Sequence, residues 1–432
     1  MISLGIALYH GEFAAVSALM EHHGVPIDME MFPQLADKDT WRALCDAMVP
    51  AIDAHYGVYV RDSAGNWTFN MEQFVAYLSR EGINWPLLES GKLDMKRKTF
   101  EEMSKAYPQL EKLRQLRYVR DKMRTVKLAV GADGRNRTVL WPFKAKTSRT
   151  QPKASQWIFS PAVWLRSLIK PEPGMAVAYV DYSSMEFLVA ASLSDRHCGP
   201  VNNMLDMYRS GDPYLSFAKR VGAAPQTATK QSHSDVRDRY KNMLLSVQYG
   251  ISPLTLADRI GVSTFEAHEM LGQHRELFAQ YWAWSDDYVA HALQTGVVQT
   301  VFGWTHHIGI IGAVNERSLR NWPVQATGAD ILRIACILAT RHGIKLLAPV
   351  HDAVLIEAPV DRIEADVVLM QEIMRRASRI VLNATVEGTH ELRTDANIVR
   401  YPARYTDKRG DAIWDHVLEL LAKHEQQAKR RA

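Results

Sequence analysis

The stretch KLLAPVHDAVLIEA, residues Lys345–Ala358, decides the fold of this chain. Two runs rich in branched aliphatic residues, Leu346–Val350 and Val354–Ile356, predict the two strands of a β-hairpin. The polar residues between them, His351 and Asp352, are therefore expected at the bend, at one end of a sheet. A carboxylate in that position is rigid and reachable, but a single aspartate does not make a metal site.

A second strand that ends in an acid lies upstream, in MAVAYVDYSSMEFL at Met175–Leu188. The apolar alternation of Ala176–Val180 stops at Asp181. If both strands belong to one sheet, Asp181 and Asp352 face a gap that two Mg²⁺ ions about 3.5–4 Å apart would fill. Taken singly, the first acid is better explained as a helix N-cap and the second as an ordinary turn residue. As a pair they predict phosphoryl-transfer chemistry.

The composition predicts a large globular protein. With 432 residues the chain can bury an extensive core in two or three domains or subdomains. A formal net charge of +4 is too small to establish a nucleic-acid partner. Cys45, Cys198 and Cys336 form no paired pattern, which indicates reduced thiols and no structural zinc. The apolar run Ile2–Tyr9 lacks a basic leader, so we expect a cytoplasmic protein without membrane spans.

A basic region precedes the Asp181 strand. Residues 99–127 predict a long helix rich in Lys and Arg, among them Lys122 and Arg124. Such a run most often forms a solvated face, and the alternative is a clamp on a phosphate backbone. Cations continue to Arg149 and Lys153 in a segment that contains glycines and prolines, which predicts a loop.

The segment DVRDRYKNMLLSVQYG, Asp235–Gly250, predicts a helix with a graded stripe. A spacing of four residues places Arg237, Lys241, Leu245 and Tyr249 on one face, from cationic to aromatic. This order suits a nucleoside triphosphate, with its phosphates on the cations and its base or sugar at the aromatic end. Considered alone, the segment is better explained as an amphipathic helix with a buried second half.

A second polar stripe is predicted on the helix at 316–326, ERSLRNWPVQA. Pro323 is expected to bend this element, and a separate apolar helix is expected at Ile331–Leu338. Long polar side chains on such a stripe suit the edges of bases and sugars in a minor groove, and the alternative is a hydrogen-bonded interior. The stripe consists of Arg317, Asn321 and Gln325.

Together these motifs resemble the polymerase region of family A DNA polymerases, the DNA polymerase I family. DYSSMEF at 181–187 is similar to motif A, RDRYKNMLLSVQYG at 237–250 to motif B, and VHDAVLIEAP at 350–359 to motif C. Further segments of the family are similar to ERSLRNWPVQATGADI at 316–331, TSRTQP at 147–152 and MEHHGVPID at 20–28.

The resemblance implies an α+β fold shaped as a right-hand polymerase, with an antiparallel-sheet palm, helical fingers and a helical thumb. Residues 1–127 would form the thumb and its base, 128–203 the first part of the palm, 204–326 the fingers, 327–405 the second part of the palm, and 406–432 a C-terminal helix with a basic tail.

The resemblance also implies roles for individual residues. Asp181 and Asp352 would hold two Mg²⁺ ions, for which Mn²⁺ would substitute, with the Tyr182 carbonyl as a further ligand. The dNTP would be bound by Arg237, Lys241, Leu245, Tyr249 and Glu186, of which Glu186 would be the steric gate against a ribose 2′-hydroxyl. Primer-template DNA would be contacted by Arg149, Arg317, Asn321, Gln325, His351, Lys122 and Arg124.

Four positions depart from the family's pattern. Ala353 replaces an acid, Ser184 a glutamine, Leu245 a phenylalanine or tyrosine, and Tyr214 a histidine. We expect the loss of the acid to weaken metal binding, and the loss of the flat ring to change discrimination among sugar-modified nucleotides.

We therefore expect a monomeric, template-directed DNA polymerase that adds dNTPs to a primer 3′-hydroxyl by two-metal phosphoryl transfer, in replication, repair gap filling or lesion bypass. Because the chain starts at the thumb, we expect no 3′→5′ proofreading. A single-subunit RNA polymerase or reverse transcriptase is a rival, against which Glu186 argues. The other alternative is a non-catalytic polymerase homologue that binds primer-template DNA.

Overall fold

The computed structural model describes residues 4–123, 128–159, 163–198, 202–308, 315–383 and 390–431. The chain forms two compact units. The first comprises Met1–Gly24, Val139–Pro152 and Gly174–Ile398, and the second comprises Val25–Thr138, Lys153–Pro173 and Val399–Ala432. The division into thumb, palm and fingers stays a prediction.

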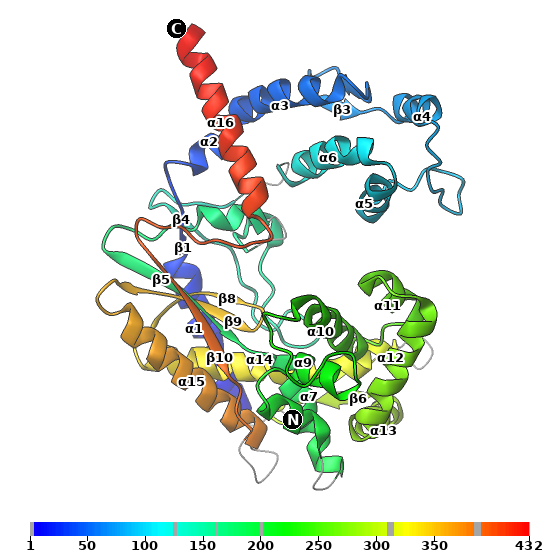
Figure 1. Ribbon diagram of the computed structural model, residues 1–432. Coiled ribbons are helices and arrows are strands. Elements are labelled where there is room, and N and C mark those ends of the chain that lie inside the picture. Colours follow the sequence, from blue (N-terminus) through cyan, green and yellow to red (C-terminus); the bar gives the residue numbers. More distant parts are fainter. Residues whose placement is uncertain are drawn as a thin grey trace. The chain divides into compact units, whose positions relative to one another are not determined.

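A four-stranded sheet forms the centre of the first unit (Figure 1). Its strands follow the order β10 (Thr394–Arg400), β5 (Met175–Tyr182), β9 (Ala353–Pro359) and β8 (Lys345–Val350). The predicted hairpin is confirmed as the antiparallel pair β8–β9. In the antiparallel pair β5–β9, Asp181 lies opposite Ala353, so the acid at the end of β5 and the hairpin bend share one end of the sheet.

Three long helices of the first unit pack against this sheet. Helix α15 (Ile363–Asn383) contacts β5 and β9, while α1 (Leu4–His23) and α14 (Glu316–Arg341) contact β8. Helix α14 carries buried residues on every side, which is typical of a core helix. The predicted division of this region into two helices is wrong. Pro323 lies inside one continuous helix, because tertiary packing outweighs the hydrogen bond that proline cannot donate.

The remaining elements of the first unit are helices and one small hairpin. Side chains cap several helices: Asp212 caps α9, Ser252 caps α11, and Ser263 forms a capping box with Glu266 in α12. The helices are α7 (Met185–Cys198), α8 (Asn203–Arg209), α9 (Pro213–Arg220), α10 (Ser234–Gln248), α11 (Pro253–Ile260), α12 (Thr264–Leu277) and α13 (Ala279–Thr295). Strands β6 (Val297–Gln299) and β7 (Thr305–His307) pair antiparallel.

The second unit is assembled from three separate segments of the chain. Its strands form two short pairs, β1 (Val25–Pro26) with β4 (Arg135–Asn136) and β2 (Tyr59–Arg61) with β3 (Trp67–Phe69). Its helices are α2 (Phe32–Ala36), α3 (Lys38–Asp53), α4 (Met71–Arg80), α5 (Arg97–Ala106), η1 (Pro108–Leu110), α6 (Glu111–Met123), η2 (Ala154–Gln156), η3 (Val163–Leu168) and α16 (Asp411–Arg431).

The predicted helix at 99–127 is wrong in its extent. Helix α5 ends at Ala106, a 3-10 turn follows at Pro108–Leu110, and α6 begins at Glu111. The break has a local cause, because Pro108 cannot donate the hydrogen bond that would continue α5. Residues 124–127 of this prediction lie outside the described residues.

Two further sequence expectations concern thiols and membranes. Cys45 and Cys336 are buried, and neither takes part in a disulfide within the described residues. In the described ranges, no helix combines the length and the apolar character that crossing a bilayer requires. The cellular compartment stays a prediction.

Candidate active site

The sheet end that carries Asp181 and Asp352 opens onto a pocket of about 1040 Å³ within the first unit. Acids from β5, the hairpin bend and β10 line it, and α10 contributes three residues of its graded stripe. The lining consists of Asp181, Tyr182, Ser183, Ser184, Met185, Glu186, Gly211, Asp212, Pro213, Tyr214, Lys230, Arg237, Lys241, Leu245, Asp352, Arg375, Arg393, Thr394 and Asp395.

The two predicted catalytic acids lie together in this pocket. His351, exposed at the hairpin bend, adopts a left-handed backbone conformation with φ 58°, and Asp352 follows it. The Tyr182 amide donates a hydrogen bond of 3.4 Å to the Asp352 carbonyl, which joins the end of β5 to the bend. Residues far apart in sequence are thus held at one sheet end by backbone pairing.

Burial and like charges raise the pKa values of these acids. The pKa of Asp181 is raised to about 7, first by burial and then by the charges of Asp352 and Asp395. Burial also raises the pKa of Asp352. Oδ1 of Asp181 is buried and has no hydrogen-bond partner among the described residues. A carboxylate in this state is well suited to a cation, which would supply both a ligand contact and the missing positive charge.

The donor set fits Mg²⁺ in part. Carboxylate and carbonyl oxygens are the ligands that this ion takes in proteins, and Asp181, Asp352 and the Tyr182 carbonyl provide them. Among the described residues, no group of three or more His, Cys, Asp or Glu side chains is arranged to hold a metal ion by itself. Substrate phosphates and water would therefore complete the coordination, which is the usual manner of binding Mg²⁺ at phosphoryl-transfer sites.

Helix α10 places two cations opposite the acids. Arg237 pairs with Asp212 and also approaches Asp238 at 3.2 Å. The charge of Lys241 lowers the pKa of Asp181, although burial outweighs this effect. Leu245 lies further along the same stripe and also lines the pocket. The helical spacing therefore brings these three side chains to one surface.

Glu186 is held at the pocket by two other predicted site residues. The Tyr249 hydroxyl donates a hydrogen bond of 2.9 Å to Glu186 Oε1. Arg149 Nη2 forms an ion pair of 3.5 Å with the same oxygen. Burial raises the pKa of Tyr249, and the negative charge of Glu186 adds to the effect. Residues from two distant motifs, Tyr249 and Arg149, thus contact the carboxylate of Glu186 in a third motif.

The predicted primer-template residues are distributed over both units. On α14, Arg317 is exposed, Gln325 is half-buried and Asn321 is 4% exposed. Arg317 packs against Gly250, where an added Cβ would lie 2.8 Å from its Cγ, so the end of α10 and the start of α14 are in close contact. Lys122 belongs to α6 of the second unit, and its side chain is not described. Arg124 lies outside the described residues.

The departures from the family pattern have structural consequences. Ala353 is fully buried opposite Asp181, so no carboxylate extends from that position. The ring of Tyr214 is buried, with Arg237 Cζ at 5.6 Å and Lys241 Nζ at 6.0 Å from its centroid. Ser184 takes a left-handed conformation with φ 55° where β5 turns into α7.

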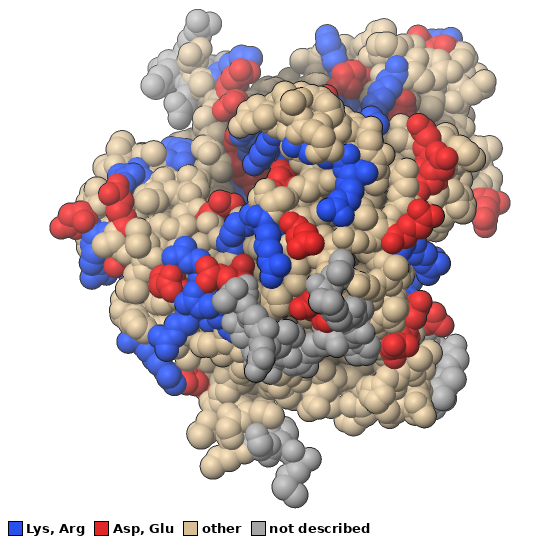
Figure 2. Space-filling model, turned by 60° about the horizontal axis from the view of Figure 1, so that its bottom comes forward, with Lys and Arg blue, Asp and Glu red and all other residues tan. Residues whose placement is uncertain are grey.

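Sequence reasoning missed the contribution of β10 and its neighbours to this pocket. Asp395 accepts a hydrogen bond from the Ser183 hydroxyl, and the Ser183 amide donates one of 2.8 Å to the Arg393 carbonyl. The start of β10, Thr394–Asn397, is largely polar and gives no sign that β10 pairs with β5. Over the face shown in Figure 2, acidic and basic side chains are interspersed.

The sequence also gave no sign of a buried network of polar contacts, which supports the segment containing Arg149. Arg333 of α14 is 1% exposed and pairs with Asp330 at 2.9 Å. Its other nitrogen, Nη2, donates to the Ser148 hydroxyl at 2.7 Å and to the Ser148 carbonyl at 3.2 Å. Arg149 directly follows Ser148, so this network anchors the loop that brings Arg149 to Glu186.

Comparison with solved structures defines the class of fold. The polymerase domain of Pol1 from M. smegmatis, in complex with DNA primer-template and dNTP, matches the chain with a TM-score of 0.70 and 23% sequence identity. The match covers 90% of this chain and 69% of that chain. The predicted α+β polymerase fold is thereby confirmed.

Comparison of sequences identifies the family. Residues 149–395 match the model of DNA polymerase family A, and since they make up more than half of the chain, the chain belongs to this family. DNA polymerase I of Chloroflexus aurantiacus is 29% identical over 231 residues, which are 50% of this chain and 23% of that protein. The thermostable DNA polymerase I of Thermus aquaticus is 26% identical over 235 residues, 52% of this chain and 27% of that protein. The alignments thus span about a quarter of these relatives.

Proposed function

We propose that the chain is a template-directed DNA polymerase that adds dNTPs to the 3′-hydroxyl of a primer. The observation that carries this proposal is the pocket in which Asp181 and Asp352 face the cationic stripe of α10. Membership of family A and the likeness to enzymes named DNA polymerase I support the same activity.

The proposed reaction is a nucleotidyl transfer. The primer 3′-oxygen forms a bond to the α-phosphorus of the dNTP and loses its proton, while the bond from that phosphorus to the leaving pyrophosphate breaks. Asp181, Asp352 and the Tyr182 carbonyl would hold Mg²⁺, which when bound lowers the pKa of a coordinated hydroxyl and neutralises phosphate charge. Arg237 and Lys241 stabilise the negative charge of the triphosphate, so the chain contributes mainly positioning and electrostatics.

Glu186 is proposed to select the sugar. Its carboxylate is fixed from two sides by Tyr249 and Arg149, at the edge of the pocket that holds the catalytic acids. A carboxylate restrained in this way would crowd a ribose 2′-hydroxyl and tolerate deoxyribose. This geometry supports DNA synthesis over RNA synthesis.

Extension of a labelled primer tests the proposal. Each dNTP or rNTP is offered singly on a defined template with Mg²⁺, and wild type is compared with Asp352→Asn. We expect template-matched dNTP addition by wild type, its loss on chelation of the metal, and a loss of at least 1,000-fold in the variant. Asp361→Asn, just beyond the opposite end of β9, is the matched control and should extend normally.

The second candidate is a non-catalytic homologue that binds primer-template DNA, and Ala353 is the observation that favours it. An apolar buried side chain stands where the family has an acid. Salt-dependent DNA binding by wild type without any extension would support this candidate and contradict polymerase activity. The absence of proofreading stays a prediction, checked by primer length after incubation with Mg²⁺ and no dNTP.

A further inference from the structure

Arg393 is a cation in the pocket to which the motifs assign no role. It immediately precedes β10, and it lines the pocket together with Asp181 and Lys241. The structure gives its guanidinium no ion pair with any acid in the described part of the chain. A pocket-lining guanidinium without an acidic partner is available to an anionic ligand.

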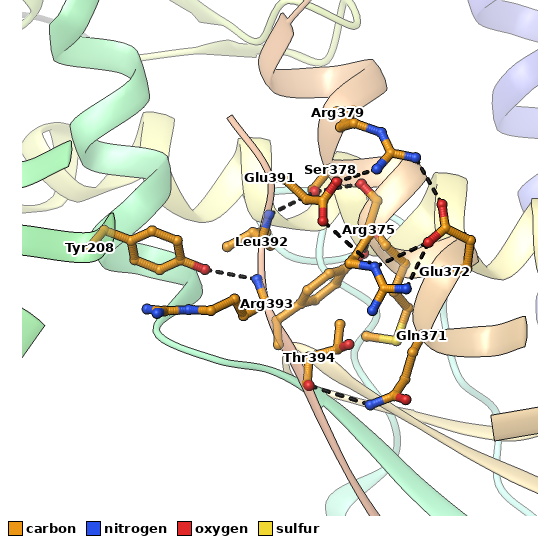
Figure 3. A network of polar contacts seen from close by, with 12 residues as sticks. Tyr208, Gln371, Glu372, Arg375, Ser378, Arg379, Glu391, Leu392, Arg393 and Thr394 are labelled. Atoms are coloured by element: carbon orange, nitrogen blue, oxygen red, sulfur yellow. Dashed lines mark hydrogen bonds and ion pairs between the residues drawn. The ribbon is translucent and has the colours of Figure 1, made fainter. Parts of the chain in front are cut away.

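The guanidinium is held in a defined orientation (Figure 3). Its Cζ lies 4.1 Å from the centroid of the Tyr208 ring, and the Arg393 amide donates a hydrogen bond of 2.8 Å to the Tyr208 hydroxyl. Nη1 lies 4.0 Å from the position that a Cβ on Gly211 would take. Stacking on a ring fixes the plane of an arginine and leaves its N–H edges free to donate.

Arg393 and the predicted phosphate ligand Arg237 flank the same turn. The Arg393 guanidinium lies near Gly211, and the next residue, Asp212, accepts a hydrogen bond from Arg237 Nε. Lys241 lies one helical turn beyond Arg237 and also lines the pocket. Two cations of α10 and one from the segment before β10 therefore line the same pocket, an arrangement that suits a ligand with several negative charges.

The neighbouring arginines differ from Arg393 in their partners. Arg375 pairs with Glu372 at 2.7 Å, and Arg379 pairs with both Glu372 and Glu391. In Figure 3 these ion pairs form a closed network on the side away from the Arg393 guanidinium. The charge of Arg379 is already matched by acids, whereas the charge of Arg393 is not.

We propose that Arg393 binds the β- and γ-phosphates of the incoming nucleotide and, after the reaction, the released pyrophosphate. The inference rests on the proposed function for the identity of the nucleotide.

Equilibrium binding tests this assignment separately from catalysis. Inorganic pyrophosphate with Mg²⁺ is titrated into wild type, Arg393→Gln, Arg393→Lys and the control Arg379→Gln, and matched dNTP is titrated into complexes with a dideoxy-terminated primer. We expect Arg393→Gln to weaken both ligands by about 10- to 100-fold, the range for losing a charge-assisted hydrogen bond. Arg393→Lys should retain part of the affinity, and Arg379→Gln should stay within about twofold of wild type.

Separate outcomes address the two proposals. Unchanged affinity of Arg393→Gln for pyrophosphate and dNTP would overturn the assignment and leave a purely structural stack on Tyr208. Weakened primer-template binding with unchanged pyrophosphate binding would overturn it in favour of a DNA-backbone contact. If wild type binds pyrophosphate through Arg393 but extends no primer, the polymerase function is refuted and the anion site is still supported.

A measurement on wild type avoids any folding defect of the variants. Phenylglyoxal modifies accessible arginines, and mass spectrometry quantifies the modification of each one. Pyrophosphate should protect Arg393 severalfold without protecting Arg379. Equal modification of Arg393 with and without saturating pyrophosphate would overturn the proposal.

Discussion

Leu245 is a single side chain for which the proposed function predicts an effect on nucleotide selectivity. It lies on the α10 stripe beyond Lys241 and lines the pocket, and under the proposed function it would lie between the phosphate end and the sugar end of a bound nucleotide. An aliphatic side chain at this point offers no hydrogen-bond partner to the sugar. Selectivity for the 3′ position then depends on the remaining groups of the pocket.

Leu245→Tyr should therefore lower discrimination against ddNTPs by about tenfold. The 3′-hydroxyl of a dNTP makes a hydrogen bond that a ddNTP lacks, and the phenolic hydroxyl beside the sugar would replace it. Competition between ddNTP and dNTP in single-nucleotide extension measures the ratio. Leu245→Met is the control, since it changes shape without adding a donor. Equal ratios in all three proteins would disprove the role of this position.

Glu186 makes a second prediction at the same scale. Glu186→Ala removes the carboxylate that Tyr249 and Arg149 hold, so rNTP incorporation relative to dNTP should rise by about 10- to 100-fold. The ratio of kcat/KM for matched rNTP and dNTP checks this. Tyr249→Phe frees one side of the carboxylate and should give an intermediate ratio, while an unchanged preference in Glu186→Ala would argue against the gate.

Helix α14 shows how an element can be held by a buried charge pair. Asp330 and Arg333 lie one turn apart and are 0% and 1% exposed. Arg333 also stacks at 4.8 Å from the Phe143 ring centroid and binds Ser148. The pair thus ties the helix to the loop that carries Arg149.

Arg333→Met should destabilise the protein by about 3–5 kcal/mol, because it leaves the carboxylate of Asp330 buried without a counter-charge. Urea denaturation measures the change in the free energy of unfolding. The double variant Asp330→Leu with Arg333→Met removes both charges and should recover most of the loss. A single variant as stable as wild type would contradict this account.

Helix α12 contains a histidine through which we expect stability to depend on pH. His274 is fully buried and its Nδ1 accepts a hydrogen bond of 3.1 Å from Trp282 Nε1, while burial lowers its pKa to about 3. Below about pH 6.5 the unfolded chain takes up a proton at this residue that the folded chain does not. The free energy of unfolding should therefore fall as the pH decreases towards 3.

His274→Gln keeps an acceptor for Trp282 but does not titrate. Relative to this variant, wild type should lose about 2 kcal/mol of stability between pH 6.5 and pH 5. Urea denaturation at several pH values measures the difference. The control His268→Gln, at an exposed position of the same helix, should leave the pH profile of wild type unchanged. Parallel profiles for wild type and His274→Gln would refute the role of burial.

At the scale of the whole molecule, each compact unit is built from three separate chain segments. In the second unit, Arg404 pairs with Asp28 at 2.7 Å and Arg166 with Asp407 at 2.8 Å. Trp414 is buried, and α16 packs against η3. The C-terminal segment therefore completes a core whose other parts lie more than 200 residues upstream.

Truncation after Arg400 should consequently destabilise the second unit while the β5–β9 pairing of the first persists. Limited proteolysis with mass spectrometry should show new early cleavages between residues 25 and 138, with the segments around β5 and β9 still protected. A shorter truncation after Lys423, which keeps Trp414, is the control. Unchanged cleavage rates in the longer truncation would show that the segment is dispensable for this core.

The sequence by itself determined the local elements and the identity of the central residues. Runs rich in branched aliphatic residues produce β5 and the β8–β9 hairpin, and a spacing of four aligns Arg237, Lys241 and Leu245 on one helix face. The resemblance of the motifs to family A DNA polymerases added expected roles for individual residues. These signals are local in the chain, so the order of residues is enough to reveal them.

Only the tertiary structure decided which distant residues meet. The pairing of β10 with β5 brings Arg393 and Asp395 to the pocket, and tertiary packing carries α14 through Pro323. The convergence of Tyr249 and Arg149 on Glu186 likewise depends on long-range packing. Strand neighbours and buried contacts follow from the free energy of the whole fold, which no local periodicity encodes.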